Sequence, residues 1–349
     1  MKLSNDFKRY LRLSPLANSR VYHLMRFMTK RKDIDAVIKK FEGGVDEKRH
    51  RAIVRGMRKA MTELHWGFEE YYLFGYESQS KEARKQFVPE YDKNIFCDRV
   101  NDCEAAKVFY DKWKTYELFS RYFKRDAIML RNVSDIRTEG FRVFAEKNHD
   151  FIYKPLFAAC GRGIEVFRTT GVDDAGNKLK TNLLKGGGII EGLIIQDDRM
   201  AIFHHQSVNT VRVITLRLKD RIEIIHPFMR VGRGGAVVDN AGAGGILGNV
   251  EVATGRVYAA CDEAGHQYEV HPDTGVPIVG FVIPRWDDAL KMVKELSNVL
   301  PQVRYVGWDL ALTRDGWVLV EGNDKGQFVF QFPLKEGFKK ELDKLKMDL

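Results

Sequence analysis

The sequence predicts an α+β protein in which a basic helical segment precedes lobes built from strands and helices. Three observations support this class. Apolar residues recur at helical spacing within residues 1–87. Short apolar strands separated by glycine-rich turns begin at Phe151, and two strands joined by a tight turn span Tyr305–Asn323. We divide the chain into the helical segment 1–87, a mixed region 88–150, a small lobe 151–200 and a large lobe 201–349.

Composition and length are those of a globular protein with a large core. The chain has 349 residues, of which 44% are hydrophobic and 30% are charged. No apolar run approaches the roughly 18 residues of a membrane span, and the N-terminus lacks the apolar core of a secretory signal. The four cysteines are scattered without a CxxC pair, which argues against a zinc or disulfide framework and favours the cytoplasm.

The positive charge is concentrated at the N-terminus. Residues 1–60 contain 17 Lys and Arg against 6 Asp and Glu, a net +11, whereas the whole chain carries +9. Such a segment could lie peripherally against anionic lipid at the inner membrane surface, or against an anionic polymer. A solvated helix surface is the alternative, and no specific nucleic-acid contact is predicted.

The region 88–150 is predicted to mix helix and strand. Tyr91–Val100 is expected to be a short connector with strand character, and Glu104–Phe123 a single helix with a regular apolar face. Short strands are expected at Ala127–Leu130 and around Phe141–Phe144.

A hairpin with a glycine-containing tip follows. The apolar strand at Phe151 ends in Lys154, and the loop Ala158–Gly163 comes next. A lysine at the end of an apolar strand is costly unless its charge has a partner, and glycines let backbone amides approach an anion. Nucleotide phosphates would satisfy both features, although the motifs GxxxxGK[ST] and GxGxxG are absent. An ordinary mobile hairpin is the alternative.

The next strand, Ile189–Ile195, follows three glycines and precedes two acids. Its end could present backbone groups to an adenine edge, and Asp197 or Asp198 could reach ribose hydroxyls. The alternative is a buried strand that leaves a turn, which would not explain why Glu191 interrupts an apolar run.

Two longer strands, Val211–Leu218 and Ile222–Val231, come next. Arg212 lies among Val and Ile, and a guanidinium in a buried or cleft-facing position normally requires an anion. A structural salt bridge is the alternative. The glycine-rich run Gly232–Gly248 is typical of a binding loop or lid.

A helix over Asp287–Leu300 precedes the hairpin Tyr305–Asn323, and a basic helix from about Leu334 closes the chain. A three-residue turn, Arg314-Asp315-Gly316, with a left-handed glycine at its last position would set Thr313 opposite Trp317. The same register sets Asp309 opposite Glu321 and adds Asn323 to that face. Facing carboxylates repel unless compensated, and oxygen ligands suit Mg²⁺. An exposed hairpin with solvated acids is the alternative.

Taken in order, several short pieces resemble the ATP-grasp superfamily over residues 91–345, and in particular the sugar-transfer-associated ATP-grasp proteins found with polysaccharide biosynthesis. The pieces are DKWKTYELF at Asp111, FIYKP at Phe151, CGRG at Cys160, IIEGLI at Ile189, SVNTVRVIT at Ser207, DNAGAGGI at Asp239 and VGWDLALTRDGWVLVEGND at Val306.

The resemblance implies two α+β lobes that hold ATP between them. It implies phosphate contacts by Lys154, with Lys112 or Lys114, and by a covering loop that includes Gly161, Arg162 and Gly163. Glu191, Leu193 and Ile194 would form the adenine hinge through backbone contacts. Mg²⁺ would be bound by Asp309, Glu321 and Asn323.

The superfamily's usual reaction is carboxylate–amine ligation, in which ATP phosphorylates a carboxylate and an amine displaces phosphate. We expect such a ligase, acting on a sugar acid or glycan precursor; a kinase and a nucleotide-sensing partner in polysaccharide assembly are the alternatives. Many ATP-grasp ligases carry an arginine two residues before the first metal acid, where this chain has Gly307. Arg212 or Arg230 could substitute. We expect Arg212 to bind the acceptor carboxylate within a substrate site of Asn209, Thr210, Arg212, Asn240, Gly244 and Gly245.

Overall fold

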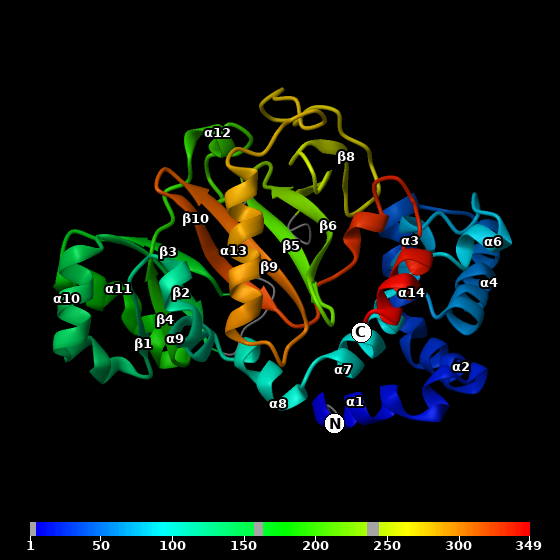
Figure 1. Cartoon of the computed structure of the whole chain (residues 1–349), viewed down its shortest axis with the longest axis horizontal. Helices are drawn as coiled ribbons and strands as arrows, with labels where there is room; N and C mark the ends of the chain where they lie inside the picture. Colours follow the sequence, from blue (N-terminus) through cyan, green and yellow to red (C-terminus); the bar gives the residue numbers. More distant parts are fainter. Residues whose placement is uncertain (1–4, 157–162, 236–243) are drawn as a thin grey trace.

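The computed structural model describes residues 5–156, 163–235 and 244–349. Its N-terminal part is helical, as expected, and packs around a core of its own that includes Phe27, Met57 and Trp66. Figure 1 shows these helices gathered at one end of the molecule, beside the C-terminal helix. They are α1 Asn5–Leu13, α2 Arg20–Lys30, α3 Ile34–Glu42, α4 Glu47–Leu64, α5 Phe68–Leu73 and α6 Lys81–Arg84.

The small lobe lies at the opposite end (Figure 1) and contains a four-stranded antiparallel sheet in the order β1-β4-β2-β3. Two helices, α10 and α11, pack on it through a core that includes Phe141, Phe151 and Leu179. Its elements are β1 Ala127–Leu130, α10 Glu139–Lys147, β2 Asp150–Pro155, β3 Glu165–Arg168, α11 Val172–Lys185 and β4 Gly188–Gly192.

The large lobe is built on a six-stranded antiparallel sheet in the order β10-β9-β5-β6-β7-β8. Helix α13 crosses one face of this sheet (Figure 1), and α7 and α14 pack on the other. Its strands are β5 Thr210–Arg217, β6 Ile222–Val231, β7 Ile246–Val250, β8 Val257–Asp262, β9 Tyr305–Thr313 and β10 Gly316–Asn323. The remaining helices are α7 Glu90–Val100, α8 Cys103–Ala106, α9 Lys112–Phe123, α12 Asp198–Ala201, α13 Trp286–Val299 and α14 Lys339–Met347.

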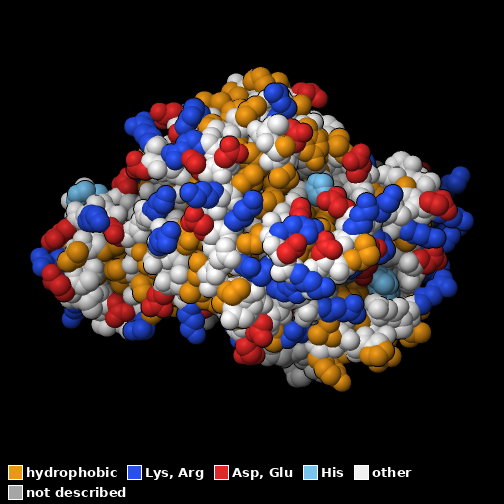
Figure 2. Space-filling model, viewed as in Figure 1, with side chains coloured by type: hydrophobic (Ala, Val, Ile, Leu, Met, Phe, Trp, Pro, Cys, Tyr) orange, Lys and Arg blue, Asp and Glu red, His pale blue; other side chains and the backbone are white. Residues whose placement is uncertain are grey.

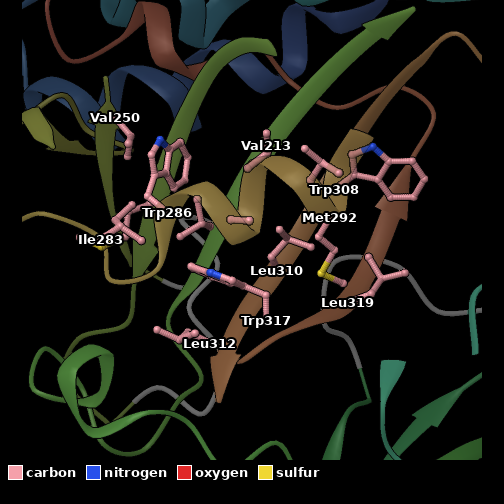
Figure 3. Close-up of a cluster of buried hydrophobic side chains, with 14 of the residues drawn as sticks. Val213, Val250, Ile283, Trp286, Met292, Trp308, Leu310, Leu312, Trp317 and Leu319 are labelled. Carbon is pink, nitrogen blue, oxygen red and sulfur yellow. The ribbon is translucent and has the colours of Figure 1, made fainter. Parts of the chain in front are cut away.

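Strand alternation decides which side chains of the large sheet reach the core beneath α13. Trp308, Leu310 and Leu312 of β9 belong to that core, together with Val213 of the neighbouring strand β5 (Figure 3). Because successive residues of a strand point to opposite faces, Asp309 and Arg212 lie on the other face. The apolar residues of β9 and β5 that pack into the core therefore determine the face on which the Asp309 and Arg212 side chains lie.

In the hairpin β9–β10, Asp309 pairs with Glu321 as predicted, but the turn differs from the predicted one. Thr313 pairs with Gly316, so the turn has two residues rather than three, and the expected pairing of Thr313 with Trp317 is wrong. A β-bulge between Leu319 and Glu321 then shifts the register by one residue and restores the pairing of Glu321 with Asp309. Bulges commonly redirect side chains beside functional sites. Here the bulge lets Leu319 enter the core while Glu321 takes the opposite face.

Three local expectations are corrected. Tyr91–Val100 belongs to a helix, α7, that is buried over much of its circumference and so lacks an amphipathic period. The segment Phe141–Phe144 lies in α10, whose first turn is capped by the Thr138 hydroxyl. The predicted helix Glu104–Phe123 is broken at Asp111, whose side chain accepts bonds from two amides and starts α9 at Lys112.

Within the described ranges, no helix is both long and apolar enough to cross a membrane.

Candidate functional site

A cleft of about 2540 Å³ runs between the two lobes and the N-terminal helices. It is bordered by Lys154 and Glu191 of the small lobe and by Asp309 and Glu321 of the large lobe. Single small-molecule pockets typically measure about 300–1,000 Å³. The cleft is therefore large enough for two substrates side by side.

Asp309 lies at the centre of a buried charge cluster on the cleft face of the large sheet. Its side chain is 0% exposed and accepts hydrogen bonds from Arg212 Nε and, at 2.6 Å, from Arg212 Nη2. Arg230 Nη2 lies 2.8 Å from the second oxygen, Oδ2. Burial alone would raise the pKa of Asp309, but the two guanidinium groups outweigh it and lower the pKa to about 2. The carboxylate is therefore held ionised in the interior.

Glu321 faces Asp309 across the hairpin and differs from it in accessibility. Its side chain is 55% exposed, and its Oε1 lies 4.0 Å from Arg212 Nη2 and 3.3 Å from the Asn323 amide nitrogen. Partial desolvation by the surrounding cleft walls and the neighbouring Asp309 carboxylate raise the pKa of Glu321. Two carboxylates and an amide thus converge where the sequence predicted a magnesium site.

This donor set fits Mg²⁺, which usually takes one or two protein carboxylates and completes its shell with water and phosphate oxygens. Among the described residues, no group of three or more His, Cys, Asp or Glu side chains is arranged to hold a metal ion. The fit therefore depends on the carboxylates of Asp309 and Glu321, on the side-chain amide oxygen of Asn323, and on oxygen atoms supplied by a substrate.

Gly307 makes room for Arg212. A Cβ atom at Gly307 would lie 3.0 Å from Arg212 Cδ and 3.3 Å from the Gly326 Cα. The arginine of the neighbouring strand thus fills the space beside Gly307, the position at which the resemblance led us to expect an arginine. A guanidinium is present next to Asp309, but it comes from β5 instead of β9.

On the small lobe, Glu191 is a buried carboxylate shared by two cations. Lys154 Nζ lies 2.8 Å from Glu191 Oε1, and Arg125 Nη2 lies 2.5 Å from Oε2. Burial alone would raise the pKa of Glu191, but Arg125 and Lys154 outweigh it and lower the pKa to about 2. Arg125 Nη1 also donates to the Leu319 carbonyl of β10 at 2.7 Å, so this cluster connects the two lobes. It explains why a glutamate interrupts the apolar strand β4.

The two alternative phosphate lysines of α9 are placed differently. Lys112 borders the cleft and donates to the Pro155 carbonyl at 3.0 Å, beside Lys154. Burial and Lys154 lower the pKa of Lys112, while Glu321 and Glu191 oppose this shift. Lys114 is exposed and, among the described residues, is not part of the cleft wall. The structure therefore brings Lys112 and Lys154 together and leaves Lys114 outside.

Of the other site residues that the sequence predicted, some border the cleft, one is on the surface and one is buried. Leu193, Ile194 and Thr210 border the cleft, and Thr210 accepts hydrogen bonds from Arg230. Asp198 is exposed and pairs with Arg314 at 3.0 Å. The Asn209 amide is fully buried and donates to the Met200 and His204 carbonyls.

The structure describes part of the predicted glycine loops. Gly163 has a left-handed φ of +70° and lies against Pro155. Gly244 and Gly245 lead into β7. Gly161, Arg162 and Asn240 lie outside the described residues.

Sequence reasoning missed several residues that shape the site. Arg125 follows Lys124 and precedes Asp126, a charged run that resembles a surface turn, so no signal marked its burial. Tyr110 donates to the buried Asp324 at 2.7 Å, directly after Asn323. The fully buried Lys93 donates to the Lys325 carbonyl at 2.7 Å. These contacts fix the chain directly after β10, the strand that carries the proposed metal ligands Glu321 and Asn323.

Replacing Glu191 by Gln should destabilise the fold by about 3–5 kcal/mol at pH 7, because Lys154 and Arg125 would lose their buried partner. The folded-state pKa of Glu191, about 2, lies below the unfolded value of about 4.3, so its contribution is present above pH 4.3 and lost as the pH falls toward 2. Denaturant unfolding of both proteins at pH 7 and pH 3 should show a smaller difference at pH 3. Glu165→Gln, at an exposed position on β3, is the control; a Glu191→Gln deficit that does not depend on pH would contradict the ion-pair assignment.

Comparison with solved structures gives low similarity. D-alanine–D-alanine ligase from Helicobacter pylori has a TM-score of 0.43 at 15% identity, with 71% of this chain and 61% of that chain covered. D-cycloserine synthetase has 0.42 at 13% identity, covering 71% and 76%. N5-carboxyaminoimidazole ribonucleotide synthetase, determined with ADP, has 0.40 at 12% identity, covering 63% and 46%. This chain thus spans less than half of that last enzyme and less than two thirds of the D-alanine–D-alanine ligase.

No curated protein matches the chain. The sequence profile of the family described as sugar-transfer associated ATP-grasp matches residues 92–347, which include both lobes and every described residue of the charge clusters around Asp309 and Glu191. The chain belongs to the sugar-transfer associated ATP-grasp family and has the ATP-grasp fold, with an additional helical segment before it.

Proposed function

We propose that the protein is an ATP- and Mg²⁺-dependent ligase that joins a carboxylate to an amine through an acyl phosphate. The observation that carries this proposal is the pair Asp309 and Glu321 on the cleft face of the large sheet, in a cleft that Lys112 and Lys154 also border. Family membership supports ATP as the nucleotide. Phosphoryl transfer needs positioned cations more than a protein nucleophile, and the cleft offers such cations on both walls.

In this proposal the chain's own residues bind and orient the two substrates. Lys154 and Lys112 contact phosphate oxygens, while the backbone at Leu193 and Ile194 contacts the adenine edge. Mg²⁺, held by Asp309, Glu321 and Asn323, would neutralise charge on the phosphates. Since Glu191 already neutralises Lys154 in part, phosphate binding has to compete with that ion pair.

The proposed reaction has two steps. An oxygen of the acceptor carboxylate attacks the γ-phosphorus, and ADP leaves. The amine nitrogen then attacks the acyl carbon, phosphate leaves, and the nitrogen loses a proton. Arg212 would place its positive charge beside the acceptor carboxylate in the first step and beside the acyl phosphate in the second, while its Nε and Nη2 remain bonded to Asp309. Its position beside Gly307 supports this role.

The N-terminal helices contribute Tyr22, Arg26 and His65 to the cleft wall, and α7 contributes Tyr91. The same wall includes the carboxylates of Glu69, Glu70 and Glu90. The Arg26 guanidinium lies 4.1 Å from the centre of the Tyr91 ring, which combines a cation with an aromatic surface. We propose a sugar acid or an acidic glycan precursor as the acceptor, in keeping with the description of the family.

The decisive assay measures ADP and phosphate release with panels of sugar acids and amines. A ligase should release both products only when a carboxylate and an amine are present together. A stable phosphorylated product without an amine would identify a kinase, and ATP binding without turnover across both panels would favour a non-catalytic role. Either outcome would reject the ligase proposal.

Glu321→Gln should lower turnover by roughly 100-fold or more and raise the Mg²⁺ concentration needed for half-maximal rate, because one charged oxygen ligand is lost. Glu321 is preferable to Asp309 for this test because it is half-exposed and approaches the buried Arg212 only at 4.0 Å. Asp315→Asn, in the exposed turn of the same hairpin, is the matched control. Normal turnover of Glu321→Gln at limiting Mg²⁺ would rule out the metal assignment.

Arg212→Lys should reduce turnover much more than ATP affinity, because one lysine ammonium cannot make the two parallel bonds to Asp309 and also present its charge to the acceptor. The change also weakens the buried pair with Asp309, so the melting temperature must be measured on the same sample. A large drop in melting temperature, with ATP affinity and turnover reduced in parallel, would assign Arg212 a purely structural role.

A further inference from the structure

The first two helices expose a cluster of large apolar side chains. Six of these side chains are between 44% and 71% exposed: Tyr10, Leu16, Val21, Leu24, Met25 and Met28. They lie on α1, on the short turn of helix at Pro15–Asn18, and on α2. Figure 2 shows hydrophobic side chains gathered along the lower right edge, over α1 and α2. We call these six residues the apolar patch. Contiguous exposed apolar surface usually marks an interaction site.

Helix α2 divides its surface among three environments. Tyr22, Arg26 and Lys30, spaced four residues apart, border the cleft. His23 and Phe27, one position further around the helix, are buried. Val21, Leu24, Met25 and Met28 occupy the remaining side and are exposed. Neither the core nor the cleft therefore accounts for the apolar character of that side.

Arginines from the end of α2 and from α4 adjoin the apolar patch. Leu24 and Met28 border a surface hollow of about 500 Å³ together with four arginines, Arg31, Arg51, Arg55 and Arg58. Asp35 also borders it, with a carboxylate oxygen 2.8 Å from His50 Nε2. The surface thus combines exposed apolar side chains with a local excess of positive charge, within the segment that carries a net +11.

We propose that α1 and α2 dock the protein onto a lipid bilayer that contains anionic lipids. In this arrangement the apolar patch enters the boundary between headgroups and acyl chains, and the arginines contact phosphate or carboxylate groups of the lipids. Helices that lie in a membrane interface have this composition, with an apolar side flanked by basic residues. Charge complementarity favours the bilayer over a neutral partner. The exposed Val, Leu and Met side chains favour it over a soluble polyanion, which would contact the arginines without them.

The test is sedimentation of the full chain with vesicles of phosphatidylcholine alone or with phosphatidylserine. Binding should require phosphatidylserine and should weaken as the salt concentration rises. The double variant Met25→Ser/Met28→Ser should lower the partition coefficient by roughly tenfold or more, because two exposed apolar side chains are lost. Arg55→Gln/Arg58→Gln should lower it by a comparable factor on anionic vesicles.

Matched substitutions elsewhere serve as controls. Leu184→Ser/Met347→Ser removes two exposed apolar side chains from α11 and α14, and Lys180→Gln/Lys185→Gln removes two charges from α11. Both should bind vesicles like the unmodified protein, and melting temperatures verify folding of every variant. The proposal is overturned if anionic vesicles fail to sediment the protein at low salt. It is also overturned if the patch variants bind vesicles normally while the protein binds polyphosphate, or if the patch proves to be the interface of a dimer that the Met25→Ser/Met28→Ser change dissociates.

Discussion

The arrangement of the large lobe depends on the buried carboxylate of Asp309 and the two arginines that hold it. An isolated charge in the interior would be prohibitively costly, and Asp309 is tolerated because Arg212 and Arg230 approach both of its oxygens. Those contacts require three adjacent strands, β6, β5 and β9, to keep their register. Register is fixed on the opposite face by the apolar residues beneath α13. Core packing and site electrostatics therefore constrain each other through the same strands.

The cluster around Glu191 has a similar role between the lobes. Arg125 contacts Glu191 on the small lobe and the Leu319 carbonyl on the large lobe. The Leu319 carbonyl lies next to the bulge that turns Glu321 toward the cleft. The relative position of Lys154 and Glu321, on opposite walls, is thus set by a short chain of charged contacts. A movement of one lobe relative to the other would have to break these contacts or form them again in the new position.

Sequence reasoning succeeded where strand alternation and the order of motifs decide the outcome. It identified the ATP-grasp fold, and it paired Asp309 with Glu321, although it assumed a three-residue turn and no bulge; the two errors cancel in the register. It failed where burial comes from several directions, as in α7, and where one short capping residue, Asp111, breaks a periodic helix. It could not find Arg125, because a charged run between a helix and a strand looks the same whether it is exposed or folded into an ion pair. Whether Asn209 or Asp198 would meet a ligand was equally hidden, since hydrogen-bond partners from other segments of the chain decide it.

The three-sided surface of α2 has a thermodynamic consequence. The same eleven-residue helix contributes Arg26 to the wall of the cleft and Met25 to the exposed apolar patch, at neighbouring positions of the chain. A contact that shifts or orders α2 from one side changes the free energy of binding on its other side. By linkage, a contact on the outer side that changes affinity for a ligand in the cleft by some factor is itself strengthened or weakened by that ligand by the same factor. A single helix could in this way make occupancy of the cleft and residence at a surface reciprocal properties.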